Sequence, residues 1–253
     1  MANEFFMRFN IHKSWGDYFG SSPYICRDVL DATDEDIKEF LGSLDNVQEV
    51  RAEYFKSKFD LQKLKGKRVL FFGDSLTSDR LGYRDCVTKS CQFEAKDGSF
   101  SGGTSSDILC IAEEYASTKP DLISIMIGTN DAIFVDKDKK CNRTSLDEYR
   151  RNLSEIICIC KKYCRNIMIM TIPGVDESKL NVDGAIKTNT NLNVERYNDV
   201  IRDVALDFGV VLNSTKEVLD CNDEIFENDG LHLCDKGQKI LAECWIKKVL
   251  EIF

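Results

Sequence analysis

Four short apolar segments alternate with helix-like patterns through the larger, C-terminal part of the chain. Each segment is almost continuously apolar, which is expected for strands covered on both faces of a parallel sheet. Between the segments, apolar residues recur every three or four positions, most clearly from Leu146 to Cys164. This alternation predicts an α/β fold, with a central parallel sheet between two layers of helices. The predicted strands are Val69–Phe72, Leu122–Ile127, Ile167–Ile172 and Val210–Leu212.

The chain before residue 66 has a different pattern. Thr33 and Asp36 are spaced as a helix N-cap pair, and apolar residues follow at helical spacing over 37–41 and again over 47–59. We predict two short helices, which need the rest of the chain to cover their apolar faces. The predicted organisation is therefore an N-terminal helical extension over residues 1–65, followed by the α/β domain over residues 66–253.

Aromatic residues are frequent at the start of this extension. Large apolar side chains in so short a segment need a surface to cover them. They either pack on the larger domain or form a surface for self-association. The residues are Phe5, Phe6, Phe9, Trp15, Tyr18 and Phe19.

Composition narrows the functional classes. The 253 residues carry a net charge of −9 at pH 7, and an acidic surface disfavours binding to nucleic acids and to anionic membranes. The sequence has no apolar stretch of about 18 residues that would predict a transmembrane helix, and its first residues lack the pattern of a signal peptide. We therefore expect a cytoplasmic protein, with neither nucleic acid nor membrane among its partners.

Cysteine usage favours the same compartment. The chain has 11 cysteines, an odd number, and several take positions that aliphatic residues would otherwise fill. We expect reduced, mostly buried thiols. Cys158, Cys160 and Cys164 lie along one predicted helix without a fourth ligand nearby, so we expect core thiols there rather than a zinc site.

Three short polar segments interrupt the apolar pattern and carry the candidate chemistry. Gly73–Leu76 follows the first predicted strand, Gly128–Asp131 follows the second, and Asp229–Leu233 lies near the C-terminus. In parallel α/β sheets, functional groups gather where the strands end. The three segments are therefore expected to meet at one edge of the sheet.

Ser75 and His232 are the candidate nucleophile and base. A serine hydroxyl is a weak nucleophile until a base activates it, and the chain has only two histidines, His12 and His232. Asp229 precedes His232 by three residues, so its carboxylate can lie against the imidazole and fix the tautomer. His12 has no such neighbour in the sequence and is predicted to be structural or exposed.

Acyl transfer also requires hydrogen-bond donors for the oxygen that becomes negative. The sequence offers the backbone N–H of Ser75, an N–H in the glycine turn Ser101–Thr104, and the side-chain amide of Asn130. The residues alone leave open whether Gly102 or Gly103 supplies the N–H of the turn.

Together, these segments give the chain a resemblance to the SGNH hydrolases, also called GDSL esterases/lipases, over residues 67–250. The resemblance implies a flavodoxin-like three-layer α/β/α fold and ester hydrolysis through an acyl-enzyme, without metal or cofactor. It implies a catalytic triad of Ser75, Asp229 and His232, and an oxyanion hole formed by Ser75, Gly102 and Asn130. The matching blocks, in the family's order, are Phe72–Thr77, Ser101–Ser105, Gly128–Asp131 and Asp229–His232.

Two features depart from the family pattern. The family has a strand between the first block and the glycine turn, and the best candidate for it is the weakly apolar Cys91–Ala95. The extension over residues 1–65 has no counterpart in a minimal family domain. The position of that strand and the role of the extension are therefore open.

The expected activity is hydrolysis of O-acetyl or other short-acyl esters on a carbohydrate or another small soluble substrate. A lysophospholipase or acyl-thioesterase with the same triad is the enzymatic alternative, because acyl-chain length is set by pocket depth. A non-catalytic module that binds a nucleotide or phosphate at Gly73–Ser78 is the alternative from another class. It is disfavoured because this loop lacks the glycine spacing and the lysine of a P-loop.

Overall fold

A parallel sheet of five strands forms the centre of the molecule. The structure is a computed structural model that describes residues 2–11, 13, 32–136, 138–180, 188–220 and 224–253. The strand order is β2-β1-β3-β4-β5, which is the flavodoxin-like order, so the predicted α/β fold is confirmed. The strands are β1 (Arg68–Gly73), β2 (Glu94–Ser99), β3 (Leu122–Met126), β4 (Ile167–Met170) and β5 (Val211–Asn213).

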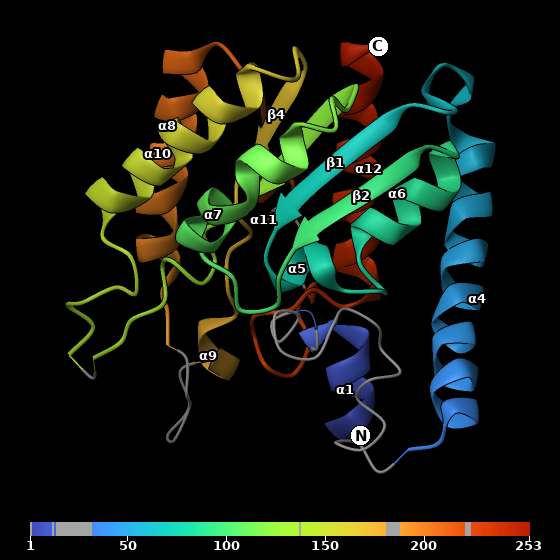
Figure 1. Ribbon diagram of the computed structural model, residues 1–253. Coiled ribbons are helices and arrows are strands. Elements are labelled where there is room, and N and C mark those ends of the chain that lie inside the picture. Colours follow the sequence, from blue (N-terminus) through green and yellow to red (C-terminus); the bar gives the residue numbers. More distant parts are fainter. Residues whose placement is uncertain (1, 12, 14–31, 137, 181–187, 221–223) are drawn as a thin grey trace.

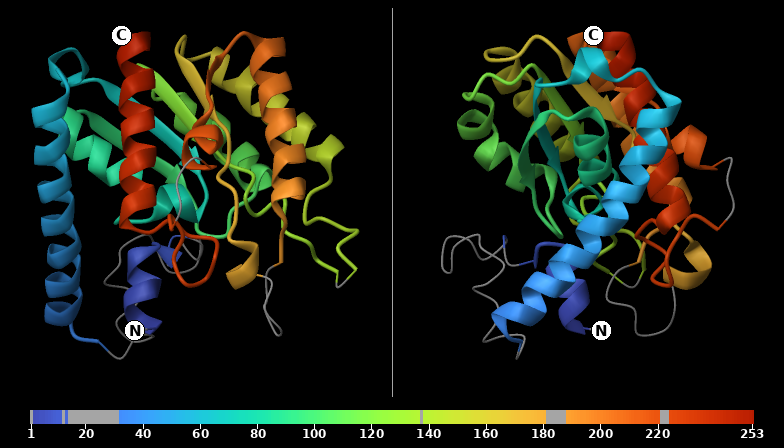
Figure 2. Two further views of the ribbon diagram at one scale, coloured as in Figure 1. Left: turned by 180° about the vertical axis from the view of Figure 1, so that it is seen from behind. Right: turned by 90° about the vertical axis from the view of Figure 1, so that its right-hand side faces the viewer.

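Helices cover both faces of this sheet. Their bounds are α1 (Ala2–Arg8), α4 (Asp34–Lys58), η3 (Gln62–Leu64), α5 (Ser75–Ser78), α6 (Tyr83–Cys91), α7 (Ser105–Ala116), α8 (Leu146–Lys161), α9 (Glu177–Leu180), α10 (Asn191–Phe208), α11 (Thr215–Asp220) and α12 (Asp235–Ile252). Helices α7, α8 and α10 pack in sequence on one face, and α6 packs with α12 on the other (Figures 1 and 2). Helix α4 lies outside α6. Connections between parallel strands are right-handed crossovers, so the direction of each connection along the sheet decides which face its helix covers. The chain runs toward one edge of the sheet from β1 to β2 and toward the opposite edge from β3 to β5, and the helices therefore form two layers.

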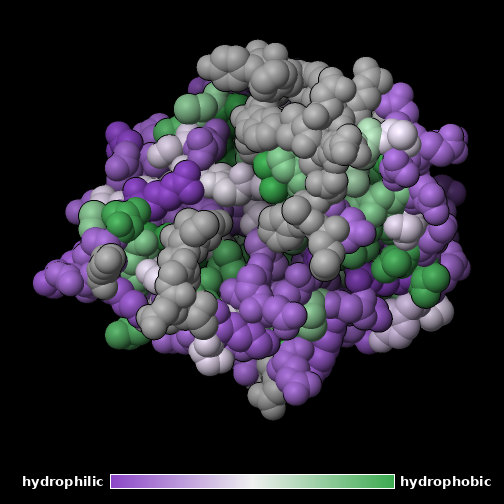
Figure 3. Space-filling model, turned by 90° about the horizontal axis from the view of Figure 1, so that it is seen from below, coloured by the Kyte–Doolittle hydropathy of each residue, from purple (hydrophilic) through white to green (hydrophobic). Residues whose placement is uncertain are grey.

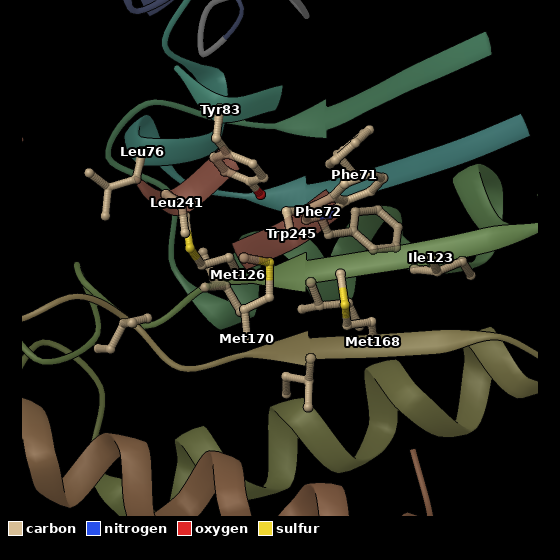
Figure 4. Close-up of a cluster of buried hydrophobic side chains, with 14 of the residues drawn as sticks. Phe71, Phe72, Leu76, Tyr83, Ile123, Met126, Met168, Met170, Leu241 and Trp245 are labelled. Carbon is tan, nitrogen blue, oxygen red and sulfur yellow. The ribbon is translucent and has the colours of Figure 1, made fainter. Parts of the chain in front are cut away.

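Aromatic side chains fill the space between the sheet and α12. Phe71 of β1 and Trp245 of α12 are fully buried, with ring centroids 5.6 Å apart (Figure 4). The indole N–H of Trp245 donates to Ser124 Oγ of β3 at 3.0 Å, which satisfies the polar atom of this buried ring. Leu76 and Tyr83 lie at the end of this core, beside the end of β1 (Figure 4). The core thus reaches the residues that follow β1.

The second strand begins later than the predicted Cys91–Ala95. Cys91 ends α6, and Gln92 terminates that helix in the left-handed conformation, with a φ of 53°. β2 then runs along the edge of the sheet, and its first residues are exposed. An edge strand that is partly exposed does not need a continuous apolar run. The prediction was wrong in position for this reason.

Residues 34–58 form one continuous helix rather than two short ones. Thr33 and Asp36 form the capping box at its start, as predicted. Its buried face differs from the predicted apolar stripe, because Val50 is 75% exposed and Arg51 is 5% exposed. The Arg51 guanidinium pairs with Asp235 of α12, and this pairing allows a charged side chain to be buried. The division of the chain at residue 65 and self-association through residues 1–65 stay predictions.

Nine cysteines lie in the described residues, and all nine are free thiols. Of these nine, Cys86, Cys91, Cys160 and Cys164 are buried, Cys234 and Cys244 are half-buried and the others are exposed, so the expectation of mostly buried thiols is wrong for the described residues. Cys158 is exposed because Ile157 and Cys160 occupy the buried face of α8 and Cys158 points away from it. None of the helices in the described ranges combines the length and the apolar character needed to cross a bilayer. A cytoplasmic location stays a prediction.

Candidate active site

The nucleophile candidate lies at the turn where β1 passes into α5 (Figure 1). Gly73 allows this turn, because a Cβ at that position would lie 2.8 Å from the carbonyl oxygen of Met126 and would also collide with Thr77. Asp74 then caps α5, and its Oδ1 accepts the N–H of Leu76 at 3.0 Å. Ser75 is therefore the first residue of a short helix at the end of a central strand, where it is 5% exposed.

The structure brings Ser75, His232 and Asp229 into one chain of hydrogen bonds. Nε2 of His232 lies 2.9 Å from Ser75 Oγ, and Nδ1 lies 2.5 Å from Asp229 Oδ2. Because a carboxylate only accepts hydrogen bonds, Nδ1 carries the proton and Nε2 is left to accept the serine hydroxyl. This is the geometry of a serine nucleophile with its base and orienting acid.

Asp229 stays ionised in this arrangement. Burial raises the pKa of its carboxyl, but the hydrogen bond and charge of His232 and the backbone N–H groups outweigh burial and hold the pKa well below its ordinary range. Oδ1 accepts the N–H groups of Leu231 and His232, both at 2.9 Å. The carboxylate therefore fixes both the backbone and the side chain of His232.

Gly230 allows the backbone conformation of the loop that carries the candidate acid Asp229 and the candidate base His232, called the acid–base loop below. Its φ of +70° is a left-handed conformation, and a Cβ here would lie 2.6 Å from the Asp176 carbonyl oxygen and 2.8 Å from the Leu180 nitrogen. The carbonyl of Gly230 accepts the N–H of Asp176 at 2.8 Å, and the N–H of Glu227 donates to the carbonyl of His232 at 2.8 Å. The loop between α11 and α12 is thus held against α9 and closed on itself.

The glycine turn Ser101–Thr104 and the segment Gly128–Asp131 after β3 lie against each other. The side-chain amide of Asn130 donates to the carbonyl of Gly103 at 3.0 Å. Within the glycine turn, Gly102 has a φ of +76°, and the N–H of Gly103 donates to the Phe100 carbonyl at 3.0 Å. The Gly102 carbonyl accepts from Arg143 Nη1 at 3.0 Å. Asn130 and the glycine turn therefore form one unit.

Asp131, next to Asn130, caps a helix that lies far from it in the sequence. Its fully buried carboxylate accepts the backbone N–H of Ser105 at 3.0 Å and the Ser105 hydroxyl at 2.6 Å. Burial raises the pKa of Asp131 above its ordinary value. Asn152 of α8 donates to the same Ser105 hydroxyl at 3.0 Å. Asp131 thus joins the loop after β3 to the N-terminus of α7, a capping role with no local pattern in the sequence.

Residues near the start of the chain also reach the site. The ring of Phe9 lies against the imidazole of His232, with centroids 4.3 Å apart, and Arg8 pairs with Asp79 and Glu227. The only signal for this in the sequence is the abundance of aromatic residues in the first positions. His12 lies outside the described residues. Within the described ranges, no group of three or more His, Cys, Asp or Glu side chains is arranged to hold a metal ion.

Comparison with known proteins agrees with this geometry. The sequence model of the GDSL-like Lipase/Acylhydrolase family matches residues 71–240, which include Ser75, Asn130 and His232. A search among curated proteins gave no match.

Solved structures share the fold. An acetylxylan esterase from Geobacillus stearothermophilus is 23% identical, with a TM-score of 0.59 over 73% of this chain and 94% of the esterase. A lipase/acylhydrolase from Enterococcus faecalis is 18% identical, with a TM-score of 0.62 over 72% of this chain and 95% of that protein. An α/β hydrolase from the metagenome of Lake Arreo, Spain, is 18% identical, with a TM-score of 0.60 over 73% and 95%. With a family match over more than half of its length and this fold, the chain belongs to the GDSL-like lipase/acylhydrolase family and is a carboxylic ester hydrolase.

Proposed function

We propose that the chain hydrolyses short-acyl esters through a Ser75–His232–Asp229 triad. The observation that carries this proposal is the continuous hydrogen-bonded chain from Ser75 Oγ through the imidazole to Asp229. His232 Nε2 takes the hydroxyl proton as Ser75 Oγ attacks the ester carbonyl, and Asp229 stabilises the imidazolium that forms. His232 then gives this proton to the departing alcohol. Water repeats the sequence on the acyl-enzyme and releases the acid.

The oxyanion is proposed to bind the N–H groups of Ser75 and Gly102 and the amide of Asn130. The N–H of Gly103 is already bonded to the Phe100 carbonyl, which favours Gly102 as the donor of the turn. One N–H of the Asn130 amide holds the Gly103 carbonyl, so the amide is oriented before substrate arrives. Preorganised donors of this kind act without further reorganisation in the transition state.

The proposed substrates are O-acetyl or other short-acyl esters of a carbohydrate or another small soluble molecule. Ser75 and His232 are 5% and 6% exposed, which favours a small acyl group over a long chain. Outside the residues drawn in grey, hydrophilic side chains predominate on the face where β1 and β2 end (Figure 3). The similar esterase from Geobacillus stearothermophilus is described as acting on acetylxylan, which adds support for an acetylated sugar.

Hydrolysis of a p-nitrophenyl ester series, from acetate to palmitate, by the wild type and Ser75→Ala tests this proposal. We expect activity on acetate and propionate that Ser75→Ala lowers by several orders of magnitude. Acetylated xylooligosaccharides would be the next substrates. A preference for long chains would instead indicate a lysophospholipase or acyl-thioesterase. Full activity in Ser75→Ala, or a folded wild type that neither hydrolyses an ester nor reacts with a fluorophosphonate, would refute the proposed chemistry.

A further inference from the structure

The segment Met7–Asn10 is buried against the active site although it lies far from the catalytic residues in the sequence. Met7, Phe9 and Asn10 are 4%, 1% and 3% exposed. Helix α1, which leads into this segment, lies beyond α5 at the end of the sheet where β1 and β2 end (Figures 1 and 2). Residues near a chain terminus are usually poorly ordered unless specific contacts hold them. Such contacts are present here: Met7 packs with Ile37 of α4, whereas Arg8, Phe9 and Asn10 contact the loops that carry Ser75 and His232.

Arg8 joins the nucleophile helix to the acid–base loop. Its Nε and Nη2 donate to the two carboxylate oxygens of Asp79, at 2.8 and 2.7 Å, and Nη2 also donates to Glu227 at 2.7 Å. Asp79 is the fully buried C-cap of α5, and the N–H of Glu227 holds the carbonyl of His232. One guanidinium therefore connects the loop that carries Ser75 with the loop that carries His232.

Phe9 contacts the same two loops and the glycine turn as well. Its ring is tilted by 45° against the imidazole of His232, with centroids 4.3 Å apart. Its carbonyl accepts the Ser78 hydroxyl at 3.1 Å and also the hydroxyl of Ser101. Asn10 adds a hydrogen bond from its amide to the Ser78 carbonyl, at 2.7 Å. Phe9 thus lies where the nucleophile, base and oxyanion segments meet.

The contact between Phe9 and His232 restricts the orientation of the imidazole, which proton transfer from Ser75 requires. Hydrogen bonds at Nδ1 and Nε2 hold the imidazole along one line, and the ring still has freedom to rotate about that line. A flat apolar ring packed on one face removes this freedom and excludes water from that face. When the imidazole takes the proton of Ser75, the electron-rich face of the aromatic ring also attracts the new cation. These effects keep Nε2 directed at Ser75 Oγ.

We propose that Phe9 is a positioning residue of the hydrolase, which orients the His232 base, and that Arg8 holds it in place by pairing with Asp79 and Glu227. The proposal rests on the triad described under the proposed function. It assigns part of the active site to the segment before residue 65, which a minimal domain of the family would not contain.

Phe9→Ala, Phe9→Leu and the control Phe6→Ala test this role in the full chain. Phe6 is a matched control because it is a phenylalanine of the same segment that packs against the cluster of Met7 and Ile37. We expect Phe9→Ala to lower kcat by about 10- to 100-fold with little change in KM, because the base is misdirected while substrate contacts remain. Phe9→Leu, which still covers the imidazole, should have an intermediate kcat. Phe6→Ala should keep the wild-type kcat, and thermal unfolding checks that each variant folds.

A second comparison distinguishes an effect of Phe9 on His232 from a general disturbance of the active-site structure. In a His232→Ala background, the residual reaction of Ser75 with a fluorophosphonate no longer uses the base. If Phe9 acts through His232, Phe9→Ala should cost nothing further there. An equal loss in both backgrounds, or a Phe9→Ala variant that matches Phe6→Ala, would overturn the inference while the wild type stays an active esterase. A folded wild type that hydrolyses no ester would instead overturn the proposed function, and this inference with it.

Discussion

Gly230→Ala tests whether the tight turn between Asp229 and His232 sets the catalytic geometry. The new Cβ would lie 2.6 Å from the Asp176 carbonyl oxygen, and ordinary van der Waals contact begins near 3.4 Å, so the loop has to move by about 0.8 Å. A shift of that size would stretch the 2.9 Å contact between His232 Nε2 and Ser75 Oγ beyond hydrogen-bond distance. We expect kcat to fall on the order of 100-fold.

Gly209→Ala is the matched control for the backbone. Gly209 caps α10 with a φ of +57°, and no atom lies within 4 Å of the position of its Cβ. Both substitutions carry the left-handed penalty of about 1–2 kcal/mol, which corresponds to a decrease in Tm of roughly 2–8 °C for a chain of this size. Only Gly230→Ala should also lose activity. Steady-state kinetics and thermal unfolding of both variants measure the difference, and equal kcat values in the two would refute the reasoning.

Three further predictions concern single side chains. Asn130→Ala should lower kcat by about 10²–10³-fold on p-nitrophenyl acetate, as the loss of one oxyanion donor does; a change below threefold would exclude that role. Asp229 has a pKa below its ordinary 3.8 in the folded state, so its carboxylate stabilises the fold above about pH 4 and this contribution disappears as the pH falls further. Thermal unfolding of wild type and Asp229→Asn should therefore differ at pH 6 and converge toward pH 2, and a difference that grows on acidification would contradict this sign. Trp245→Phe should lower the free energy of unfolding by about 1–3 kcal/mol, because the buried Ser124 oxygen loses its donor; urea denaturation measures it, and unchanged stability would mean that this oxygen finds another donor.

The strands that sequence reasoning found are those whose burial leaves a continuous apolar run. β1 and β3 are buried on both faces and were predicted nearly to the residue. β2 lies at the sheet edge with a polar sequence, and only the tertiary structure determines its position. On α4, the charged Arg51 is buried and the apolar Val50 is exposed, which is the opposite of what their polarity predicts. Arg51 can be buried because it pairs with a distant carboxylate on α12. Pairing between distant residues is not visible in local periodicity.

The same distinction applies to the site. Asp229 and His232 are three residues apart, so the sequence alone could place the carboxylate against the imidazole, and the structure has this contact. Gly73, Asp74 and Ser75 directly follow a predicted strand, so the position of Ser75 at the end of that strand could also be predicted from a short stretch of sequence. The contact between Phe9 and His232 joins positions near opposite ends of the chain, and no short motif encodes it. The roles of the oxyanion donors stay predictions.

The ion pair between Arg8 and Glu227 has a consequence for biosynthesis. The two residues are 219 positions apart, so at ordinary translation rates the ribosome adds Glu227 roughly 10–45 s after Arg8. During that interval, the sheet can begin to assemble while Phe9 lacks the imidazole that covers it. Hydrolytic competence therefore arrives only when the segment with Glu227 and His232 emerges and closes on Arg8 and Phe9. Recovery of esterase activity during refolding would report this final closure, later than spectroscopic signals from the sheet.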